Sequence, residues 1–206
     1  MTLPRLHAVT DGDVLARADF LERLTAIATL GSRVAVHLRD RDADARTFWQ
    51  LVERAAPVVR QHGAMLVVNA RPDIAAMVHA HAVQLGDADL SVDDARRVAA
   101  HALVGRSVHE LDEGRRAVGD GADYLLVGNV HQTPSHPGRP GLGLARLSEF
   151  LELGRPVIAI GGITPEAADA VHAVGAWGVA AIRAVWDAPD PAAAAEALLV
   201  PWERAA

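Results

Sequence analysis

The sequence contains no cysteine, so disulfide bridges, thiolate zinc sites and a cysteine nucleophile are all excluded. The absence also fits the reducing cytoplasm, and we expect a cytoplasmic protein. The N-terminal segment, residues 1–7, has no charged start followed by a long apolar run, so no signal peptide is expected. No apolar run approaches the roughly 18 residues of a membrane helix, which predicts that the protein has no membrane partner.

An excess of positive charge is also missing, because the formal net charge is -6. An acidic chain is a poor partner for nucleic acid or for an anionic membrane, and we expect neither. Half of the residues are apolar (50%) and 22% are charged, a composition that builds a sizeable core. An anionic substrate would therefore need a locally positive pocket.

Short apolar runs alternate with longer amphipathic segments along the whole chain. The expected strands are Leu6–Thr10, Arg33–Leu38, Ala64–Asn69, Ala82–Leu85, Leu103–Ser107, Tyr124–Val130, Pro156–Ile160 and Gly178–Ile182. The expected helices are 14–30, 44–61, 72–80, 91–100, 110–120, 144–152, 165–174 and 191–199. Strands that are apolar throughout indicate burial on both faces, as in a parallel sheet covered by helices.

Eight strand–helix units in 206 residues give about 26 residues per unit, near the minimum for a closed barrel. We therefore predict an α/β fold, a (β/α)8 TIM barrel that forms a single domain over residues 1–206. An open doubly wound sheet is the alternative. It is disfavoured because Leu6–Thr10 leads into Asp11-Gly12-Asp13 and not into a G-x-G-x-x-G loop.

Polar side chains stand at the ends of the expected strands, where the active sites of such barrels lie. Three of these ends are polar–apolar–polar triplets, in which residues i and i+2 share a face. A single histidine at a strand end is more often structural than catalytic, but several here stand at equivalent strand ends. The candidates for catalysis or substrate binding are His37, Arg39, Asn69, Gln84, Ser107, His109, Asn129 and His131.

A glycine pair, Gly161 and Gly162, follows the seventh strand and leads into a helix that begins at Thr164. Glycines let backbone N–H groups approach an anion, and the helix presents its positive end. The eighth strand ends at Ile182 and Arg183, and arginine can bind phosphate through two hydrogen bonds. We predict a phosphate site at these four residues. A tight turn beside an exposed arginine is the alternative.

The acidic and histidine side chains form no recognisable metal site. Asp87 and Asp89 follow the fourth strand and are possible ligands, but Asp89 precedes a helix and is more typical of a cap. His131 and His136 are irregularly placed and lack the usual zinc spacing. From the residues alone we predict no metal ligand.

Several short motifs occur in order at the expected strands. They are Leu6–Asp11, Val36–Asp40, Val68–Asn69 with Asp73–Ala75, Val83–Leu85, Gly105–His109, Gly121–Tyr124 and Ile158–Thr164. Together they resemble the thiamine-phosphate synthase and thiazole tautomerase superfamily, over about residues 5 to 190. The resemblance implies a single-domain TIM barrel of thiamine biosynthesis.

The synthases of this superfamily have an aspartate after the third strand that helps to bind the magnesium of a pyrophosphate substrate, and this chain has Ala70 there. The second acid of the synthases is kept as Asp89. The synthases also have a lysine in the loop after the sixth strand, where this chain has His136. Thr133 and Ser135 of the same loop are implied substrate contacts.

Other positions resemble the tautomerase branch. They are His37, in place of the synthases' glutamine, and the segments Val83–Leu85 and Gly105–His109. The tautomerases have a Gly-His-Val-aromatic pattern after the sixth strand, and their histidine transfers a proton. This chain has Asn129 at that place and His131 two positions on, on the same face of the expected strand and about 6 to 7 Å further along.

We therefore expect a thiazole tautomerase, an isomerase that needs no cofactor and makes a small phosphorylated carboxythiazole aromatic by moving a proton. His131 is the expected proton-transfer residue and His109 the second, with Asn129 beside them. Histidine suits this role because its pKa lies near neutrality. His37 and Arg39 are expected to hold the substrate carboxylate.

Two alternatives remain open. The first is thiamine-phosphate synthase, which joins thiazole phosphate to a pyrimidine pyrophosphate with magnesium. The second is a catalytically silent relative that binds a thiazole or thiamine phosphate, or a partner protein, in a regulatory role. Ala70 argues against the first, and Asn129 argues against a tautomerase. A homo-oligomer is compatible with the sequence.

Overall fold

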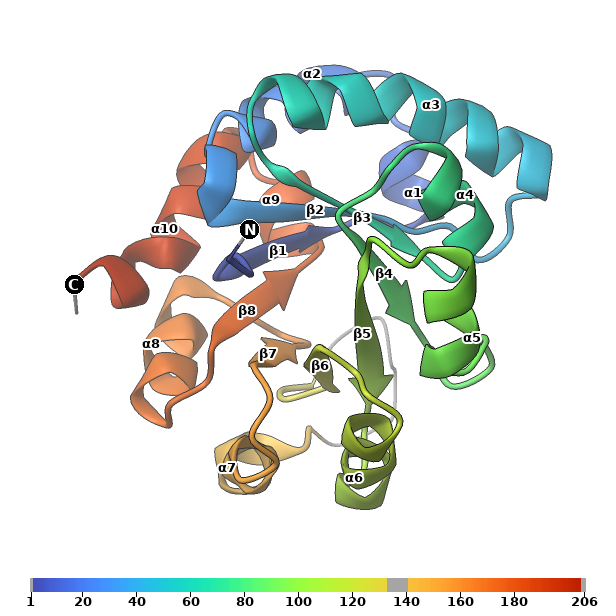
Figure 1. Cartoon of the computed structure of the whole chain (residues 1–206). Helices are drawn as coiled ribbons and strands as arrows, with labels where there is room; N and C mark the ends of the chain where they lie inside the picture. Colours follow the sequence, from blue (N-terminus) through green and yellow to red (C-terminus); the bar gives the residue numbers. More distant parts are fainter. Residues whose placement is uncertain (1, 133–140, 205–206) are drawn as a thin grey trace.

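The strands of the protein close into a parallel barrel, which Figure 1 shows in sequence colours. The computed structural model describes residues 2–132 and 141–204. Each strand pairs with the next one in the sequence, and the last pairs with the first. This closed order confirms the TIM barrel and rules out the open sheet. The strands are β1 (Leu6–Val9), β2 (Val34–Leu38), β3 (Met65–Asn69), β4 (Ala82–Leu85), β5 (Leu103–Val108), β6 (Tyr124–Gly128), β7 (Val157–Ile160) and β8 (Gly178–Ala181).

Helices surround the barrel and cover its outer face (Figure 1). They are α1 (Gly12–Leu15), α2 (Phe20–Ala28), α3 (Ala45–Gln61), α4 (Pro72–Met77), α5 (Val92–Val98), α6 (Leu111–Gly119), α7 (Gly143–Leu151), α8 (Pro165–Ala173), α9 (Arg183–Trp186) and α10 (Pro191–Glu203), with a 3-10 turn at Gly31–Arg33. Most of the expected helices are found within a few residues of their predicted limits. The four-residue helix α9 was not expected, because one turn is too short to show a periodic pattern.

The expected helix 14–30 is in fact two helices, α1 and α2. The carboxylate of Asp19 lies between them and accepts hydrogen bonds from Nε of Arg17 at 2.9 Å and from Nε of Arg23 at 2.6 Å. It therefore makes no capping bond to the start of α2. The two arginines anchor the turn, and the helical pattern is interrupted there.

The strands are buried on both faces, as their apolar sequences predict. In β2, Val34, Val36 and Leu38 belong to the apolar layer between the sheet and the helices. Ala35 belongs to a second cluster inside the barrel, and His37, two residues on, shares its face. Position within a strand thus decides whether a side chain packs under the helices or points into the barrel.

Tyr124 fills part of the barrel interior and is fully buried. The ring fits only because residue 105 of the neighbouring strand is glycine. A Cβ atom on Gly105 would lie 2.2 Å from Cζ of Tyr124 and 2.4 Å from Oε1 of Gln84. The absence of a side chain at this position makes room for a tyrosine and a glutamine in the core.

The sixth strand ends at Gly128, two residues earlier than expected. The next amides turn toward the loop after β7: Val130 N–H donates to the carbonyl oxygen of Ile160 at 2.8 Å, and His131 N–H to that of Gly161 at 3.1 Å. The expected extension of the strand to Val130 is therefore wrong. Val130 and His131 lie in the loop after β6, and their amides bond to the end of β7 and the residue after it.

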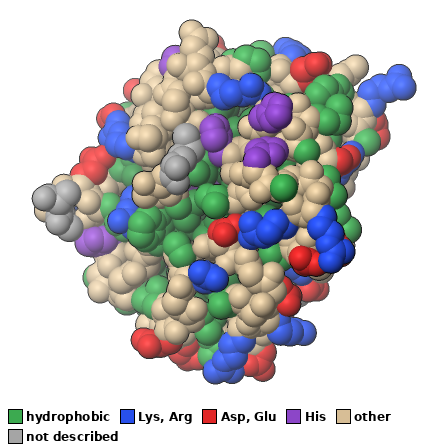
Figure 2. Space-filling view, in the orientation of Figure 1, with side chains coloured by type: hydrophobic (Ala, Val, Ile, Leu, Met, Phe, Trp, Pro, Cys, Tyr) green, Lys and Arg blue, Asp and Glu red, His purple; other side chains and the backbone are tan. Residues whose placement is uncertain are grey.

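The surface carries mixed charge. In Figure 2, blue arginines and red acidic side chains are scattered over the visible face, and several purple histidines lie near one another in its upper part. All 20 of the strongly basic residues are arginine, because the chain has no lysine. Within residues 2–132 and 141–204, no helix combines the length and the apolar character needed to cross a bilayer.

Candidate active site

The carboxyl ends of the strands form the mouth of the barrel, and two hydrogen-bonded pairs of expected site residues meet there. His37 Nδ1 lies 3.1 Å from Asn69 Oδ1, between β2 and β3. Gln84 Nε2 donates to Ser107 Oγ at 3.0 Å, between β4 and β5. His37 and Gln84 are buried, whereas Asn69 and Ser107 are partly exposed. Each pair thus holds one polar group at the mouth with a buried one behind it.

Arg39 supplies positive charge on the β2 side of the mouth. Its backbone is fixed by Thr10, whose Oγ1 accepts from Arg39 N–H at 2.9 Å and donates to the Arg39 carbonyl at 3.2 Å. Within the described residues, the guanidinium has no hydrogen-bond or ion-pair partner. Burial lowers the pKa of Arg39 and the charge of Arg41 lowers it further, while the carboxylates of Asp11, Asp40 and Asp89 raise it, and the guanidinium remains charged at neutral pH. An unpaired cation in this position suits an anionic substrate.

The glycine pair lies on the other side of the mouth, after β7. Gly161 and Gly162 have φ values of 102° and 65°, a left-handed conformation that favours glycine. A Cβ atom on Gly161 would lie 2.6 Å from Cβ of Asn129, and one on Gly162 would lie 2.7 Å from Cβ of His131. The N–H groups of both glycines find no acceptor among the described residues. The helix α8 begins just beyond, with Thr164 as its N-cap, so unpaired donors and a helix N-terminus lie together.

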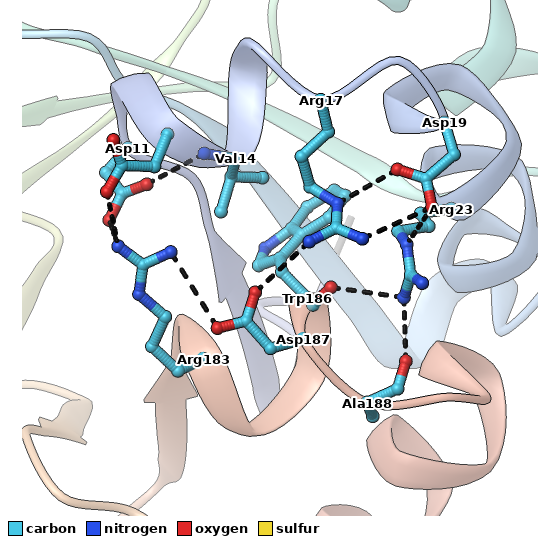
Figure 3. A network of polar contacts seen from close by, with 10 residues as sticks. Asp11, Val14, Arg17, Asp19, Arg23, Arg183, Trp186, Asp187 and Ala188 are labelled. Carbon is cyan, nitrogen blue, oxygen red and sulfur yellow. Dashed lines mark hydrogen bonds and ion pairs between the residues drawn. The ribbon is translucent and has the colours of Figure 1, made fainter.

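The side chain of Arg183 points toward the segment after β1, as Figure 3 shows. Its guanidinium lies 2.9 Å from Asp11 Oδ2, 3.0 Å from Asp13 Oδ2 and 3.8 Å from Asp187 Oδ2. In this arrangement its charge is balanced by carboxylates. The backbone N–H groups of Ile182 and Arg183 have no acceptor within the part of the chain that the structure describes. A phosphate at this loop would therefore meet backbone donors first.

The two histidines expected to transfer protons, and Asn129 beside them, are held by different contacts. His109 donates from Nδ1 to the Gly128 carbonyl, and its backbone N–H donates to Oε2 of Glu113 at 2.7 Å. Asn129 Nδ2 donates to the His131 carbonyl at 3.2 Å. His131 Nε2 is buried and finds no partner among residues 2–132 and 141–204. All three residues thus lie near the carboxyl end of β6, where the Gly128 carbonyl accepts from His109.

The mouth does not contain the pair of aspartates that the resemblance implies for magnesium. Ala70 offers only a methyl group, and its φ is 62°. Oδ2 of Asp89 accepts from Gly86 N–H at 2.6 Å and closes the loop after β4, while Ser91 caps α5 in place of the expected Asp89. No cluster of three His, Asp or Glu side chains suited to a metal occurs in the described part of the chain. The residues present therefore do not fit a magnesium site built by the protein alone.

Thr133 and Ser135, expected to contact the substrate, lie outside the described residues. Two buried polar residues of the first strand region were overlooked by sequence reasoning. Thr10 holds Arg39, and His7 Nδ1 lies 2.7 Å from Nε2 of His37. The signal was present, because in an extended strand His7 lies on the face opposite to Leu6 and Ala8.

Comparison with known proteins gives consistent results. The family model described as thiamine monophosphate synthase matches residues 6–185. A thiamine-phosphate synthase of Thermus thermophilus is 44% identical over 176 residues, which cover 84% of this chain and 85% of the relative. The thiamine-phosphate synthase of Mycolicibacterium vanbaalenii is 39% identical over 193 residues, 88% of this chain and 87% of the relative. The solved thiamine phosphate pyrophosphorylase from Pyrococcus furiosus superposes with a TM-score of 0.85 at 32% identity, covering 98% of this chain and 96% of that one.

These relatives contradict the expectation of a thiazole tautomerase. Relatives with 39% and 44% identity are named as synthases, which are transferases and not isomerases. The expectation was wrong because it gave single positions such as Ala70 too much weight. Magnesium is commonly bound by one or two carboxylates together with substrate phosphates, so one missing carboxylate does not exclude a synthase.

Proposed function

The chain belongs to the thiamine monophosphate synthase family, and on that premise we propose that it is a thiamine-phosphate synthase. The proposed reaction joins a thiazole phosphate to a pyrimidine pyrophosphate and releases pyrophosphate. Both substrates are small phosphorylated molecules, which agrees with the donors at the barrel mouth.

The chemistry of this reaction sets what the site must do. The ring nitrogen of the thiazole attacks the methylene carbon of the pyrimidine, and the bond from that carbon to the pyrophosphate oxygen breaks. The nitrogen uses a lone pair and carries no proton, so the product is a quaternary thiazolium and no base is required. The site must hold two anionic substrates side by side and stabilise the charge that develops on the leaving pyrophosphate.

One observation carries the proposal: the mouth has donors to anions on two separate sides. Arg39 and Asn69 provide a guanidinium and an amide at the ends of β2 and β3. Gly161 and Gly162 provide unpaired backbone N–H groups after β7, within the part of the chain that is described. In a closed barrel of eight strands, these two groups stand on different sides of one opening. Two phosphorylated substrates can then be bound with their reacting ends between the two sites.

The individual residues receive the following roles in this proposal. Arg39 and Asn69 bind the pyrophosphate of the pyrimidine substrate. The backbone of the loops after β7 and β8 binds the phosphate of the thiazole. Residues between these sites line the space for the two rings and need no proton-transfer role. The thiazole phosphate site comprises Gly161, Gly162, Ile182 and Arg183, and the lining residues are His37, Gln84, Ser107, His109, Asn129 and His131.

The resemblance implies magnesium as the cofactor of a synthase. When bound, magnesium would offset negative charge on the pyrophosphate, but the described residues do not fit a protein-built site for it. The positive charge that the chain itself contributes comes from Arg39 and from Arg41, which lowers the pKa of Arg39, while the nearby carboxylates of Asp11, Asp40 and Asp89 raise it. Since the chain has no lysine, arginine must provide all of the strong positive charge.

The direct test incubates the purified protein with thiazole phosphate and pyrimidine pyrophosphate, over a range of magnesium concentrations, and measures thiamine phosphate and pyrophosphate. A synthase should form the two products in equal amounts, with turnover on the order of 1 per second or faster. The variant Arg39→Met keeps most of the side-chain length and removes the charge, so it should lose most of the activity. Product formation that is absent, or unequal, would contradict the proposal.

A second function is supported by Ala70 alone. A catalytically silent relative that binds thiazole phosphate or thiamine phosphate would not need a metal ligand at this position. Such a protein should be stabilised against heat by these phosphates and yet form no product, because a ligand that prefers the folded state raises its stability. The same preparation therefore distinguishes the two functions.

A further inference from the structure

Three hydrogen-bonded side chains, those of His7, His37 and Asn69, form a row that runs from the barrel interior to its mouth and is called the file below. His7 Nδ1 lies 2.7 Å from His37 Nε2, and His37 Nδ1 lies 3.1 Å from Asn69 Oδ1. The three residues stand on the neighbouring strands β1, β2 and β3. His7 and His37 have no exposed surface, while Asn69 is partly open at the mouth. A buried group thus connects to a residue that the proposed function places against substrate.

The hydrogen-bond chemistry of the file determines where its protons are. The amide oxygen of Asn69 only accepts, so His37 must donate to it from Nδ1. Burial lowers the pKa of His37 to about 4, and burial and His37 together lower the pKa of His7, so both rings are neutral near pH 7. A neutral imidazole has one N–H, which leaves His37 Nε2 as an acceptor. His7 must therefore donate from Nδ1, and the file has one direction, from His7 through His37 to Asn69.

This direction decides what the mouth presents to a substrate. With its oxygen occupied by His37, Asn69 turns its NH2 group away from His37, and that nitrogen has no acceptor among the described residues. Arg39 lies two residues beyond His37 and adds a second donor without a partner in the same part of the chain. Two donors suit a phosphorylated substrate. If His37 carried its proton on Nε2, Asn69 would have to present its oxygen, which repels an anion.

At the inner end of the file, the ring of His7 packs against Tyr124, with 5.7 Å between the ring centroids, but one of its nitrogens lacks a hydrogen bond among the described residues. His7 Nε2 is buried without a hydrogen-bond partner in the described part of the chain. An unpaired buried nitrogen is unfavourable, and an apolar side chain would suit the barrel core better. The polar contact that His7 does make is through its other nitrogen, Nδ1, which faces His37.

We propose that His7 is a positioning residue for the synthase site: its Nδ1 proton holds His37 in the Nδ1-protonated form, and His37 holds the Asn69 amide with its NH2 group toward the substrate. The proposal rests on the proposed function for its kinetic consequence. The proton arrangement itself is a property of the folded chain and can be measured without substrate.

The first test is long-range ¹H–¹⁵N spectroscopy of the histidine rings in the intact protein at pH 7 to 8, with His37 assigned from the loss of its signals in His37→Gln. The ¹⁵N shifts should show His37 and His7 both protonated at Nδ1. Protonation of His37 at Nε2 would overturn the proposal, whatever the activity of the preparation. This result also decides the matter if a His7 variant does not fold.

The second test compares His7→Leu with His7→Asn. Leucine removes the donor at similar volume, whereas the asparagine NH2 can take the place of Nδ1–H. His7→Leu should leave His37 in a mixture of tautomers and raise the KM for the pyrophosphate substrate about tenfold, the scale of losing a hydrogen bond to a charged group. kcat should change by less than about twofold, because no residue moves a proton in the chemical step. His7→Asn should restore both the His37 tautomer and the KM.

Two outcomes of the second test would count against His7. One is a folded His7→Leu variant with the wild-type His37 tautomer and the wild-type KM. The other is a rise in KM that His7→Asn fails to reverse, which would indicate a packing role. Complete absence of synthase activity in the wild-type protein would contradict the proposed function and leave the spectroscopic test of His7 intact.

Discussion

The guanidinium of Arg183 lies 2.9 Å from Oδ2 of Asp11 and so joins the segment after the last strand to the segment after the first. The same group also contacts Asp13. It lies 3.8 Å from Oδ2 of Asp187 as well, a contact that Figure 3 shows. The arginine thus connects the two ends of the sheet where the barrel closes. Carboxylates of the protein balance the charge of the Arg183 side chain. The side chain therefore stabilises the fold, whereas the backbone N–H is the group proposed to bind phosphate.

Replacing Arg183 with methionine should lower stability by about 1 kcal/mol, because exposed ion pairs are worth little individually but this side chain meets three carboxylates. The affinity for thiazole phosphate should fall less than about threefold, since backbone donors are proposed to bind it. Urea unfolding and calorimetric binding measure the two effects. Arg115→Met, which removes an exposed ion pair on α6, is the control. A tenfold or greater loss of affinity would show that the Arg183 side chain leaves Asp11 to bind the ligand.

Replacing Gly162 with valine should weaken thiazole phosphate binding at least tenfold, about 1.4 kcal/mol. The new side chain would block the approach to the backbone N–H and collide with Cβ of His131, 2.7 Å from the new Cβ atom. Gly154→Val is the matched control, because Gly154 has a similar φ of 70° and no atom within 4 Å of its potential Cβ. Both variants carry the strain of valine in a left-handed conformation, and only the first should lose affinity. Equal affinities in the two folded variants would contradict the phosphate site.

Replacing Ala70 with aspartate should make synthase activity more responsive to magnesium. The backbone at Ala70 already has a φ of 62°, which aspartate and asparagine tolerate better than alanine, so the fold should accept the change. Ala70→Asn is the control, since it has the same shape without the charge. Magnesium titrations of initial rate compare the three proteins. If wild type and Ala70→Asp show the same magnesium dependence, Asp89 and the substrate phosphates are sufficient for the metal.

Stability should fall on acidification because of the buried histidines. The pKa of His37 is lowered by burial from 6.5 to about 4, so the unfolded chain binds a proton before the folded one does. The contribution of His37 to the free energy of unfolding is complete above pH 6.5 and is lost progressively between pH 6.5 and 4. It amounts to about 3 kcal/mol. The pKa of His7 shifts in the same direction. Urea unfolding at several pH values gives the free energy of unfolding as a function of pH. This free energy should fall less steeply on acidification for His37→Gln than for wild type, and an equal dependence on pH would contradict the assignment.

Replacing His131 with alanine should change kcat by less than about threefold, because the proposed reaction removes no proton. The pH dependence of kcat should also be unaltered. His131 packs against Gly162, so a moderate change in the KM for thiazole phosphate is compatible with a lining role. A fall in kcat of about 100-fold, the usual scale of general acid–base catalysis, would show that His131 takes part in the chemistry.

The sequence by itself determined the barrel and much of its mouth. Alternating apolar and amphipathic segments report which residues are buried, and burial on both faces of short strands leaves few arrangements other than a parallel barrel. The residues at strand ends followed from the same reasoning, because parallel strands in a closed barrel all finish on one side. His37 and Asn69, and Gln84 and Ser107, were named from their positions and are hydrogen-bonded in pairs.

The tertiary structure alone decided where the side chains point and what they contact. Arg183 meets Asp11 across 172 residues, and no local pattern encodes a contact between positions so far apart. The sixth strand was expected to reach Val130 but ends at Gly128, and the amides of Val130 and His131 donate to the carbonyls of Ile160 and Gly161. The hydrogen bond between His7 and His37 depends on the register of two neighbouring strands. Local sequence reports burial and periodicity, while the partner of each polar group depends on how distant segments pack together.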